Sequence, residues 1–182
     1  MKKFFLTLCV ALFAIGAQAQ QKGDFALGVK GGLSFTKIQF GNDKENITRG
    51  AIGAFAQYNL TNHWRAELEG IYHPKKDNVS DFTAGLNIQY LIDVCESVKI
   101  YPQLGYALAF VHQDDIVFAN GSSISHDDKN TTDSGIQFGL GAQFNIGEKA
   151  FILADYKFQP GIFGDCHVVN VGVGFRFYHY EH

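Results

Sequence analysis

The sequence has no apolar run long enough to cross a bilayer as a helix. The nearest candidate is the uncharged stretch from Phe4 to Gly16, which has 13 residues, whereas a membrane-spanning helix needs ~20. Lys2 and Lys3 precede this stretch and the small residues of Ala17-Gln18-Ala19 follow it, a pattern typical of a cleaved export signal. We therefore expect residues 1–19 to be a signal peptide and residues 20–182 to form one domain.

Positive charge is also scarce. The chain has 15 Lys and Arg against 18 Asp and Glu, and loss of Lys2 and Lys3 with the signal would leave the mature domain with a net charge of −5. Because binding to a nucleic-acid duplex requires a concentrated basic face, this balance argues against a nucleic-acid partner.

Helical periodicity is missing from the mature segment, which alternates apolar with polar or small residues throughout. In the stretch DFALGVKGGLSF, for example, Phe, Leu, Val, Leu and Phe alternate with Ala, Gly, Lys, Gly and Ser. Several such stretches exceed ten residues, a length suited to tilted strands that cross a membrane. We predict eight strands, with alternation over residues 24–35, 49–60, 64–73, 81–92, 98–111, 135–146, 150–159 and 169–177.

One face of every predicted strand is apolar, and the other lacks the bulky apolar side chains of a hydrophobic core. An eight-stranded barrel accounts for both faces, because its outer face meets lipid and its narrow interior is filled by side chains. The predicted fold class is therefore all-β, an eight-stranded antiparallel up-and-down transmembrane β-barrel after a cleaved signal peptide. Aromatic residues near the strand ends are expected to form two interfacial girdles: Phe25, Phe35, Tyr58, Trp64, Tyr72, Phe82, Tyr90, Phe151 and Phe177.

Seven charged residues fall on the inward face in this register: Lys30, Arg65, Glu67, Glu69, Asp155, Lys157 and Arg176. Charges inside a narrow barrel are costly unless they are paired, so we expect them to form an ion-pair and hydrogen-bond network. A gated polar path for ions or small solutes is one interpretation. The interpretation that we favour is a polar plug that holds the barrel together.

Residue spacings typical of catalytic, cofactor or metal sites are absent. The acidic loop over residues 112–134 gathers His126, Asp127 and Asp128 with Asp114 and Asp115. It lacks the spacing of a calcium-binding loop. We therefore predict a solvated loop, with no bound metal and no cofactor.

Hydroxyl and imidazole groups also occur near the expected rim of the barrel. Ser122, Ser123 and Ser125 share a loop with His126, and His73 and His167 flank other loops. Because no motif fixes any of these residues as nucleophile and base, we predict no catalytic residue. A lipid-modifying enzyme with its site at the rim stays open as an alternative.

The stretches GAFAQYNLTNHWRAELEGIY (Gly53 to Tyr72) and VGVGFRF (Val171 to Phe177) carry a family resemblance. With their alternating glycines and aromatics and their tight turn, they resemble the outer-membrane β-barrel domain family common in Bacteroidetes, of OmpA/OmpX-like size and related to PorT-type barrels. The resemblance implies insertion by the barrel-assembly machinery, guided by an aromatic residue that ends the last strand. It implies no single activity. The chain departs from the pattern by continuing as YHYEH, so either Phe177 or Tyr180 could be that aromatic residue.

In the predicted barrel, the turns at 61–63, 93–97 and 147–149 face the periplasm with both termini, and the loops at 41–47, 74–80, 112–134 and 161–166 face outside. Cys95 and Cys166 then lie at opposite ends of a span of ~25 Å. A disulfide requires Cα atoms within ~7 Å, so we predict that these two cysteines do not pair.

The predicted function is that of a non-enzymatic outer-membrane protein, which contributes to envelope integrity or, through its outer loops, to surface contact. Outer-membrane lipid and the barrel-assembly machinery are its expected partners. The second alternative is a soluble, lipocalin-like ligand carrier whose apolar face turns inward. That arrangement would crowd Arg65, Glu67 and Glu69 on the outside of one strand, and no lipocalin-type signature follows the first strand.

Overall fold

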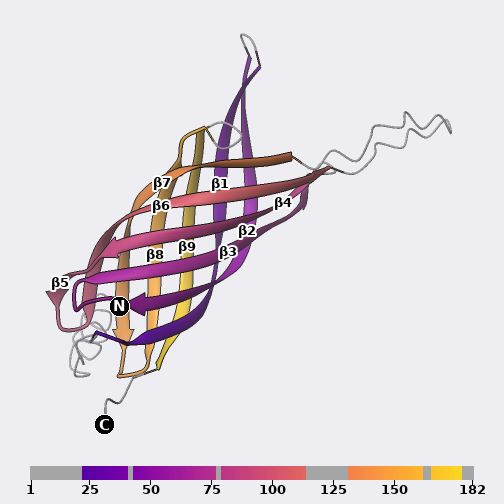
Figure 1. Cartoon of the computed structure of the whole chain (residues 1–182). Coiled ribbons are helices and arrows are strands. Elements are labelled where there is room, and N and C mark those ends of the chain that lie inside the picture. Colours follow the sequence, from indigo (N-terminus) through magenta and orange to yellow (C-terminus); the bar gives the residue numbers. More distant parts are fainter. Residues whose placement is uncertain (1–21, 41–42, 77–78, 114–130, 162–164, 178–182) are drawn as a thin grey trace, which may run out of the picture.

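Antiparallel strands make up most of the described part of the chain (Figure 1), and most of them alternate large apolar with small or polar residues. The computed structural model describes residues 22–40, 43–76, 79–113, 131–161 and 165–177. Within these ranges the strands are β1 (Phe25–Phe40), β2 (Asp43–Asn59), β3 (Trp64–Lys76), β4 (Val79–Tyr90), β5 (Ile92–Cys95), β6 (Val98–Gln113), β7 (Thr131–Ile146), β8 (Ala150–Gln159) and β9 (Asp165–Phe177).

The sheet closes on itself. Except for β4 and β5, strands that are neighbours in the chain pair with each other; β1 also pairs with β9, and β4 pairs with β6. The strands β4 and β5 are two parts of one barrel strand, because both pair with β6 in the same register: Gln89 faces Gln103 and Ile92 faces Ile100. Only Leu91 separates them, and its N–H donates to the carbonyl of His63 at 2.7 Å. The described strands thus form a closed antiparallel barrel of eight strands, as predicted.

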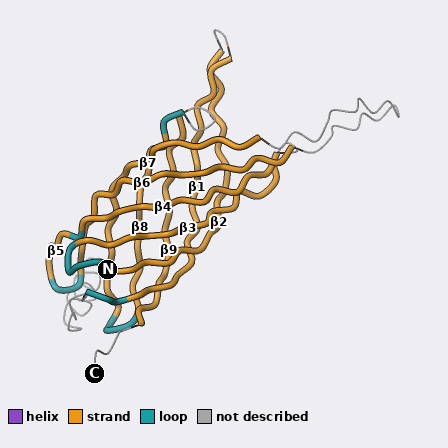
Figure 2. Tube along the Cα trace, viewed as in Figure 1, coloured by secondary structure: helices purple, strands orange, loops and turns teal. Residues whose placement is uncertain are grey.

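The two ends of the barrel differ (Figure 2). Short turns connect β2 to β3, β5 to β6 and β7 to β8 at the end where β1 begins and β9 finishes, with Phe25 opposite Phe177. At the other end the β1–β2 and β6–β7 pairs extend past their neighbours: β2 pairs with β3 only from Ile52, and β7 pairs with β8 only from Phe138. The described part of the chain contains no helix long and apolar enough to span a membrane.

The strands are longer at this second end than the sequence predicts. The predicted loops 41–47, 74–80, 112–134 and 161–166 are too long, because residues 43–47, 74–76, 79–80, 112–113, 131–134 and 165–166 belong to strands. Backbone pairing needs no apolar side chains, so it continues beyond the residues whose hydropathy alternates. The predicted signal peptide (1–19), the serines and His126 of the acidic loop, its aspartates and Tyr180 all lie outside the described residues.

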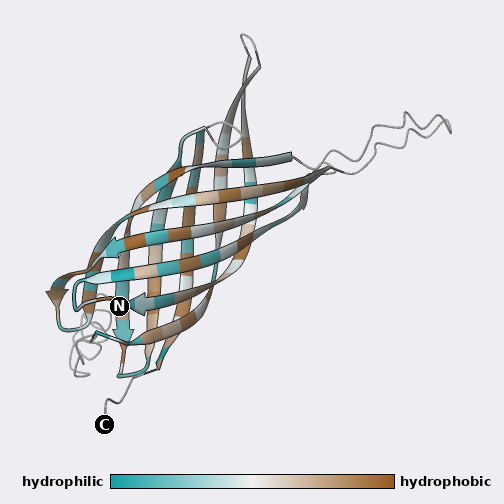
Figure 3. Cartoon of the chain, in the orientation of Figure 1, coloured by the Kyte–Doolittle hydropathy of each residue, from teal (hydrophilic) through white to brown (hydrophobic). Residues whose placement is uncertain are grey.

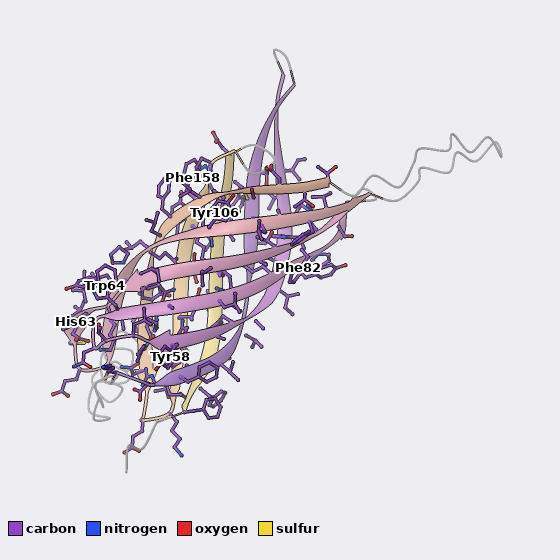
Figure 4. The ribbon with its side chains drawn as sticks, in the orientation of Figure 1. Tyr58, His63, Trp64, Phe82, Tyr106 and Phe158 are labelled. Carbon is purple, nitrogen blue, oxygen red and sulfur yellow. The ribbon has the colours of Figure 1, made fainter. Side chains whose placement is uncertain are left out.

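Large apolar side chains cover the outside of the barrel. Along the strands, hydrophobic residues alternate with hydrophilic ones (Figure 3). Eight of the nine predicted girdle aromatics are among the exposed large residues, including Trp64 and Phe177. Tyr58, His63 and Trp64 lie near the end with the short turns, and Phe82, Tyr106 and Phe158 lie toward the other end (Figure 4). Trp64 packs edge-on against Tyr90 at 4.9 Å between ring centroids.

Phe151 is the exception among the predicted girdle residues. It is 1 % exposed and points into the barrel, as do Phe55 and Tyr101. Its strand position explains the error, because Phe151 shares an alternation phase with the inward Asp155 and Lys157. The inward face is therefore less free of large apolar groups than we predicted. Glycines make room for these rings: an added Cβ would overlap Phe55 at Gly28, Phe151 at Gly174 and Tyr101 at Gly141.

Candidate functional site: the charged interior of the barrel

Polar and charged side chains fill the interior where a soluble protein would have its apolar core. All seven residues of the expected lumen network point inward, and none is more than 5 % exposed. They come from β1 (Lys30), β3 (Arg65, Glu67 and Glu69), β8 (Asp155 and Lys157) and β9 (Arg176). Alternate residues of a strand share a face, which is why three charges of β3 enter the lumen together.

Two lysines and three carboxylates form a central cluster. Lys30 Nζ lies 3.2 Å from Glu67 Oε1 and 4.0 Å from Asp155 Oδ2, and it also pairs with Glu69 Oε2. Lys157 Nζ pairs with Glu69 Oε1 from the opposite wall and lies 4.0 Å from Glu67 Oε1. Since β1, β3 and β8 are not all neighbours in the sheet, these ion pairs tie the barrel walls together across the lumen.

Amide side chains surround this central cluster. Gln57 Nε2 donates to Glu67 at 2.7 Å, Asn87 Nδ2 donates to Glu69 at 3.0 Å, and Asn170 Nδ2 donates to Asp155 at 2.9 Å. Gln137 Nε2 lies 3.1 Å from Glu69 Oε1, and its own carbonyl accepts from Gln159 Nε2 at 2.7 Å. The sequence reading placed some of these amides on the inward face but did not assign them to the network. These amides could have been predicted to join the network, because they alternate in the strands in step with the inward residues and so share the inward face.

The two arginines of the expected network belong to a second group, nearer the end with the short turns. Arg65 donates from Nε to Gln89 Oε1 and from Nη1 to Gln143 Oε1, each at 2.6 Å. Its guanidinium carbon lies 5.0 Å from the ring centroid of Tyr101. Arg176 bonds to Asn145 Oδ1, which also accepts from Gln143 Nε2 at 2.8 Å. The seven predicted residues therefore form two adjacent groups of contacts within the described part of the chain.

A third polar group, which the sequence reading missed, lies toward the extended end. Asp81 on β4 pairs with Arg49 on β2, and Asp81 Oδ2 lies 2.7 Å from His73 Nδ1 on β3. His73 is 7 % exposed, so it faces the interior. His167 faces outward instead and shares a 2.7 Å hydrogen bond with the hydroxyl of Tyr156.

Among the residues that the structure describes there is no metal centre, and no serine, threonine or cysteine is hydrogen-bonded to a histidine. No group of three or more His, Cys, Asp or Glu side chains there could hold a metal ion. His73 Nε2 has no hydrogen-bond partner within the same ranges. Cys95, at the end of β5, is exposed, and Cys166, near the start of β9, is buried; both are free thiols at opposite ends of the barrel.

The chemical character of the interior is that of mutual neutralisation. Each carboxylate of the central cluster faces an ammonium group and at least one amide donor, so most of its buried charge is compensated, with one carboxylate more than the two lysines. Eight strands leave an interior just wide enough for side chains. A closed barrel with an apolar exterior and a charged, filled interior defines the class of small outer-membrane β-barrels.

The chain belongs to the outer membrane protein beta-barrel domain family, whose model matches residues 5–177. It is an outer-membrane protein. A search of curated proteins found no match to the sequence.

Solved structures share the fold at low sequence identity. The N-terminal β-barrel domain of Pseudomonas aeruginosa OprF superposes with a TM-score of 0.66 at 17% identity, covering 87% of this chain and 100% of that one. Neisserial surface protein A gives 0.64 at 13% identity, covering 86% and 100%. The attachment invasion locus protein Ail of Yersinia pestis gives 0.55 at 15% identity, also covering 86% and 100%. At such identities the likeness extends to the fold alone.

Proposed function

We propose that the protein is a non-enzymatic transmembrane barrel that supports the integrity of the outer membrane or mediates surface contact through its extracellular loops. The observation that carries this proposal is the inverted distribution of side chains. Large apolar residues such as Leu68 and Val171 are more than half exposed, whereas the charges of the central cluster are buried. Exposure of this apolar surface to water would be unfavourable, whereas in a membrane it would contact the apolar chains of the lipid.

The orientation and export of the barrel are parts of the same proposal. Residues 1–19 act as a cleaved signal peptide, the short turns and both termini face the periplasm, and the extended strand pairs β1–β2 and β6–β7 face outside. Short periplasmic turns and longer extracellular loops are the usual arrangement of such barrels, which supports this assignment. Insertion then depends on the barrel-assembly machinery, and outer-membrane lipid is the surrounding partner.

The lipocalin-like alternative is opposed by the charge of the interior. A carrier of apolar ligands requires an apolar cavity, whereas here Lys30, Glu67 and Lys157 occupy the lumen. The rim-enzyme alternative receives no support from the described residues, because no serine, threonine or cysteine there bonds to His73 or His167; the hydroxyl at His167 is that of Tyr156, on the outer face. Its serines and His126 lie outside those residues.

The test of the proposal is a deletion strain complemented with two forms of the protein. One form is the full chain, and in the other a short turn replaces residues 114–130. Sensitivity to detergents measures envelope integrity, and adhesion to host or neighbouring cells measures surface contact. Rescue of detergent resistance by both forms supports an envelope role, and adhesion restored by the full chain alone supports a role of the loop. A change in lipid A structure on deletion, with both other properties unaltered, would overturn the proposal in favour of the enzyme.

A further inference from the structure

Arg65 is a buried cation for which the described residues provide no carboxylate partner. Its side chain is fully buried, and its two hydrogen-bond partners, Gln89 and Gln143, are uncharged amides. Its Nη2 atom has no hydrogen-bond partner within the described ranges. A buried charge is retained only where something compensates it. The ring of Tyr101, 5.0 Å away, and the more distant carboxylates of Glu67 and Asp155, which do not touch Arg65, supply only a partial compensation.

The neighbours of Arg65 also have unused donors. Gln103 Nε2, Asn145 Nδ2 and the hydroxyl of Tyr101 are buried and, in the described part of the chain, make no hydrogen bond. Gln103 is joined to Arg65 through Gln89, and Asn145 is joined to it through Gln143. Every unpaired atom of this group can therefore donate a hydrogen bond, and among these atoms only the Tyr101 hydroxyl can also accept one.

Each carbonyl oxygen of the group already accepts at least one hydrogen bond. Gln89 Oε1 and Gln143 Oε1 accept from Arg65, Gln103 Oε1 accepts from Gln89 at 3.2 Å, and Asn145 Oδ1 accepts from Gln143. A water molecule at this place would bring two further hydrogens that need acceptors, whereas an anion only accepts.

We propose that the barrel interior binds a small inorganic anion, of the size and charge of chloride, against Nη2 of Arg65. The unpaired donors of Tyr101, Gln103 and Asn145 lie in the same bonded group and complete its coordination. The anion neutralises Arg65 as Glu67 and Glu69 neutralise the lysines of the central cluster. This inference does not depend on the biological role proposed above.

The first experiment compares the purified, folded protein in detergent with sodium chloride and with sodium gluconate at equal ionic strength, since gluconate carries the same charge as chloride on a much larger organic anion. The measurement is the midpoint temperature at which the compact gel band converts to the unfolded one. We expect the midpoint to rise with chloride concentration, on the order of 5 °C at a concentration a hundred times the dissociation constant. Equal midpoints in the two salts at all concentrations would overturn the proposal.

Matched variants assign the effect to Arg65. Arg65→Met removes the charge but keeps a long side chain, and it should abolish the difference between the two salts. Lys99→Met is the control: Lys99 is also buried, at the same end, but pairs with the carboxylate of Asp93, so its variant should keep the difference. A chloride effect that persists in Arg65→Met, or disappears in both variants, contradicts the site.

If Arg65→Met does not fold, a crystallographic experiment with bromide takes the place of the variants. Crystals of the unaltered protein grown in sodium bromide should show an anomalous peak in contact with Arg65 Nη2. A peak at that place supports the proposal. An ordered water there, with bromide found only at the surface, overturns it.

Discussion

Glu69 is the residue on which the central cluster depends most. It pairs with both Lys30 and Lys157 and accepts hydrogen bonds from Asn87 and Gln137. We expect Glu69→Gln to destabilise the barrel by about 3–5 kcal/mol, because two buried ammonium groups would lose a shared counter-charge. Urea unfolding in lipid vesicles, followed by the fluorescence of the single tryptophan, Trp64, measures this change.

Asp93→Asn is the matched control for Glu69→Gln. Asp93 also pairs with a buried lysine, Lys99, but the Asp93 side chain is 54% exposed. Water therefore screens the pair, and we expect a cost of about 0–1 kcal/mol. Equal costs for the two variants would show that the central ion pairs contribute no more than a pair at the surface.

Gly28 tests whether the small residues of β1 exist to admit the inward aromatic rings. A Cβ at this position would overlap both the ring of Phe55 and the carbonyl oxygen of Val173. We expect Gly28→Ala to destabilise the barrel by roughly 1–3 kcal/mol through overpacking, measured by the same urea midpoint. Gly50→Ala, where a Cβ would meet no atom within 4 Å, should change the stability by less than about 0.5 kcal/mol.

At the level of the strand, alternation in the sequence predicts which residues face inward wherever the phase is marked by a charge. The three charges of β3 are recognisable in this way because a one-residue slip would move them all to the apolar face. Phe151 was misassigned since a large aromatic near a strand end fits either an interfacial girdle or a lumen with opposing glycines. Phe151 can face inward because Gly174, on the neighbouring strand β9, leaves room for its ring.

The strand residues at the extended end of the barrel could not be predicted for a different reason. Residues 43–47 of β2 pair with residues 36–40 of β1. The sequence of residues 43–47, DKENI, is mostly polar and shows no alternation of hydropathy. Backbone hydrogen bonds maintain this pairing, and a hydropathy pattern does not report on them. The amide side chains around Glu67 and Glu69 were missed because their hydrogen-bond partners come from strands distant in the sequence.

The apolar outer face of β3 provides a test of membrane placement at the level of the element. Leu68 is 60% exposed in the middle of the strand, between Ala56 and Leu86 on the neighbouring strands. Leu68→Arg should cost about 2–4 kcal/mol if this face lies at mid-membrane, whereas Leu60→Arg, in the short turn after β2, should cost about 0–1 kcal/mol. Refolding yield into lipid vesicles and urea midpoints measure the difference. Equal costs would contradict a membrane-spanning β3.

For the whole molecule, the free cysteines report the orientation of the barrel. Cys95 is exposed at the end with the short turns, and Cys166 is buried near the opposite end. If the short turns face the periplasm, a membrane-impermeant maleimide should label Cys95 only after the outer membrane is permeabilised. Cys166 should react only after unfolding, because its thiol is enclosed by the barrel and accepts a hydrogen bond from Thr36 at 3.4 Å.

A thiol introduced at the other end completes this test. Thr132 is exposed on β7 at the extended end, so Thr132→Cys in a Cys95→Ala background should be labelled in intact cells. Labelling of Cys95 in intact cells, with protection of the introduced thiol until permeabilisation, would reverse the orientation. The extended strand pairs would then face the periplasm, and a surface role for the connections between them would be excluded, because only groups beyond the outer leaflet can contact another cell. An envelope role would survive that result, since the ion pairs that join the walls act equally in either orientation.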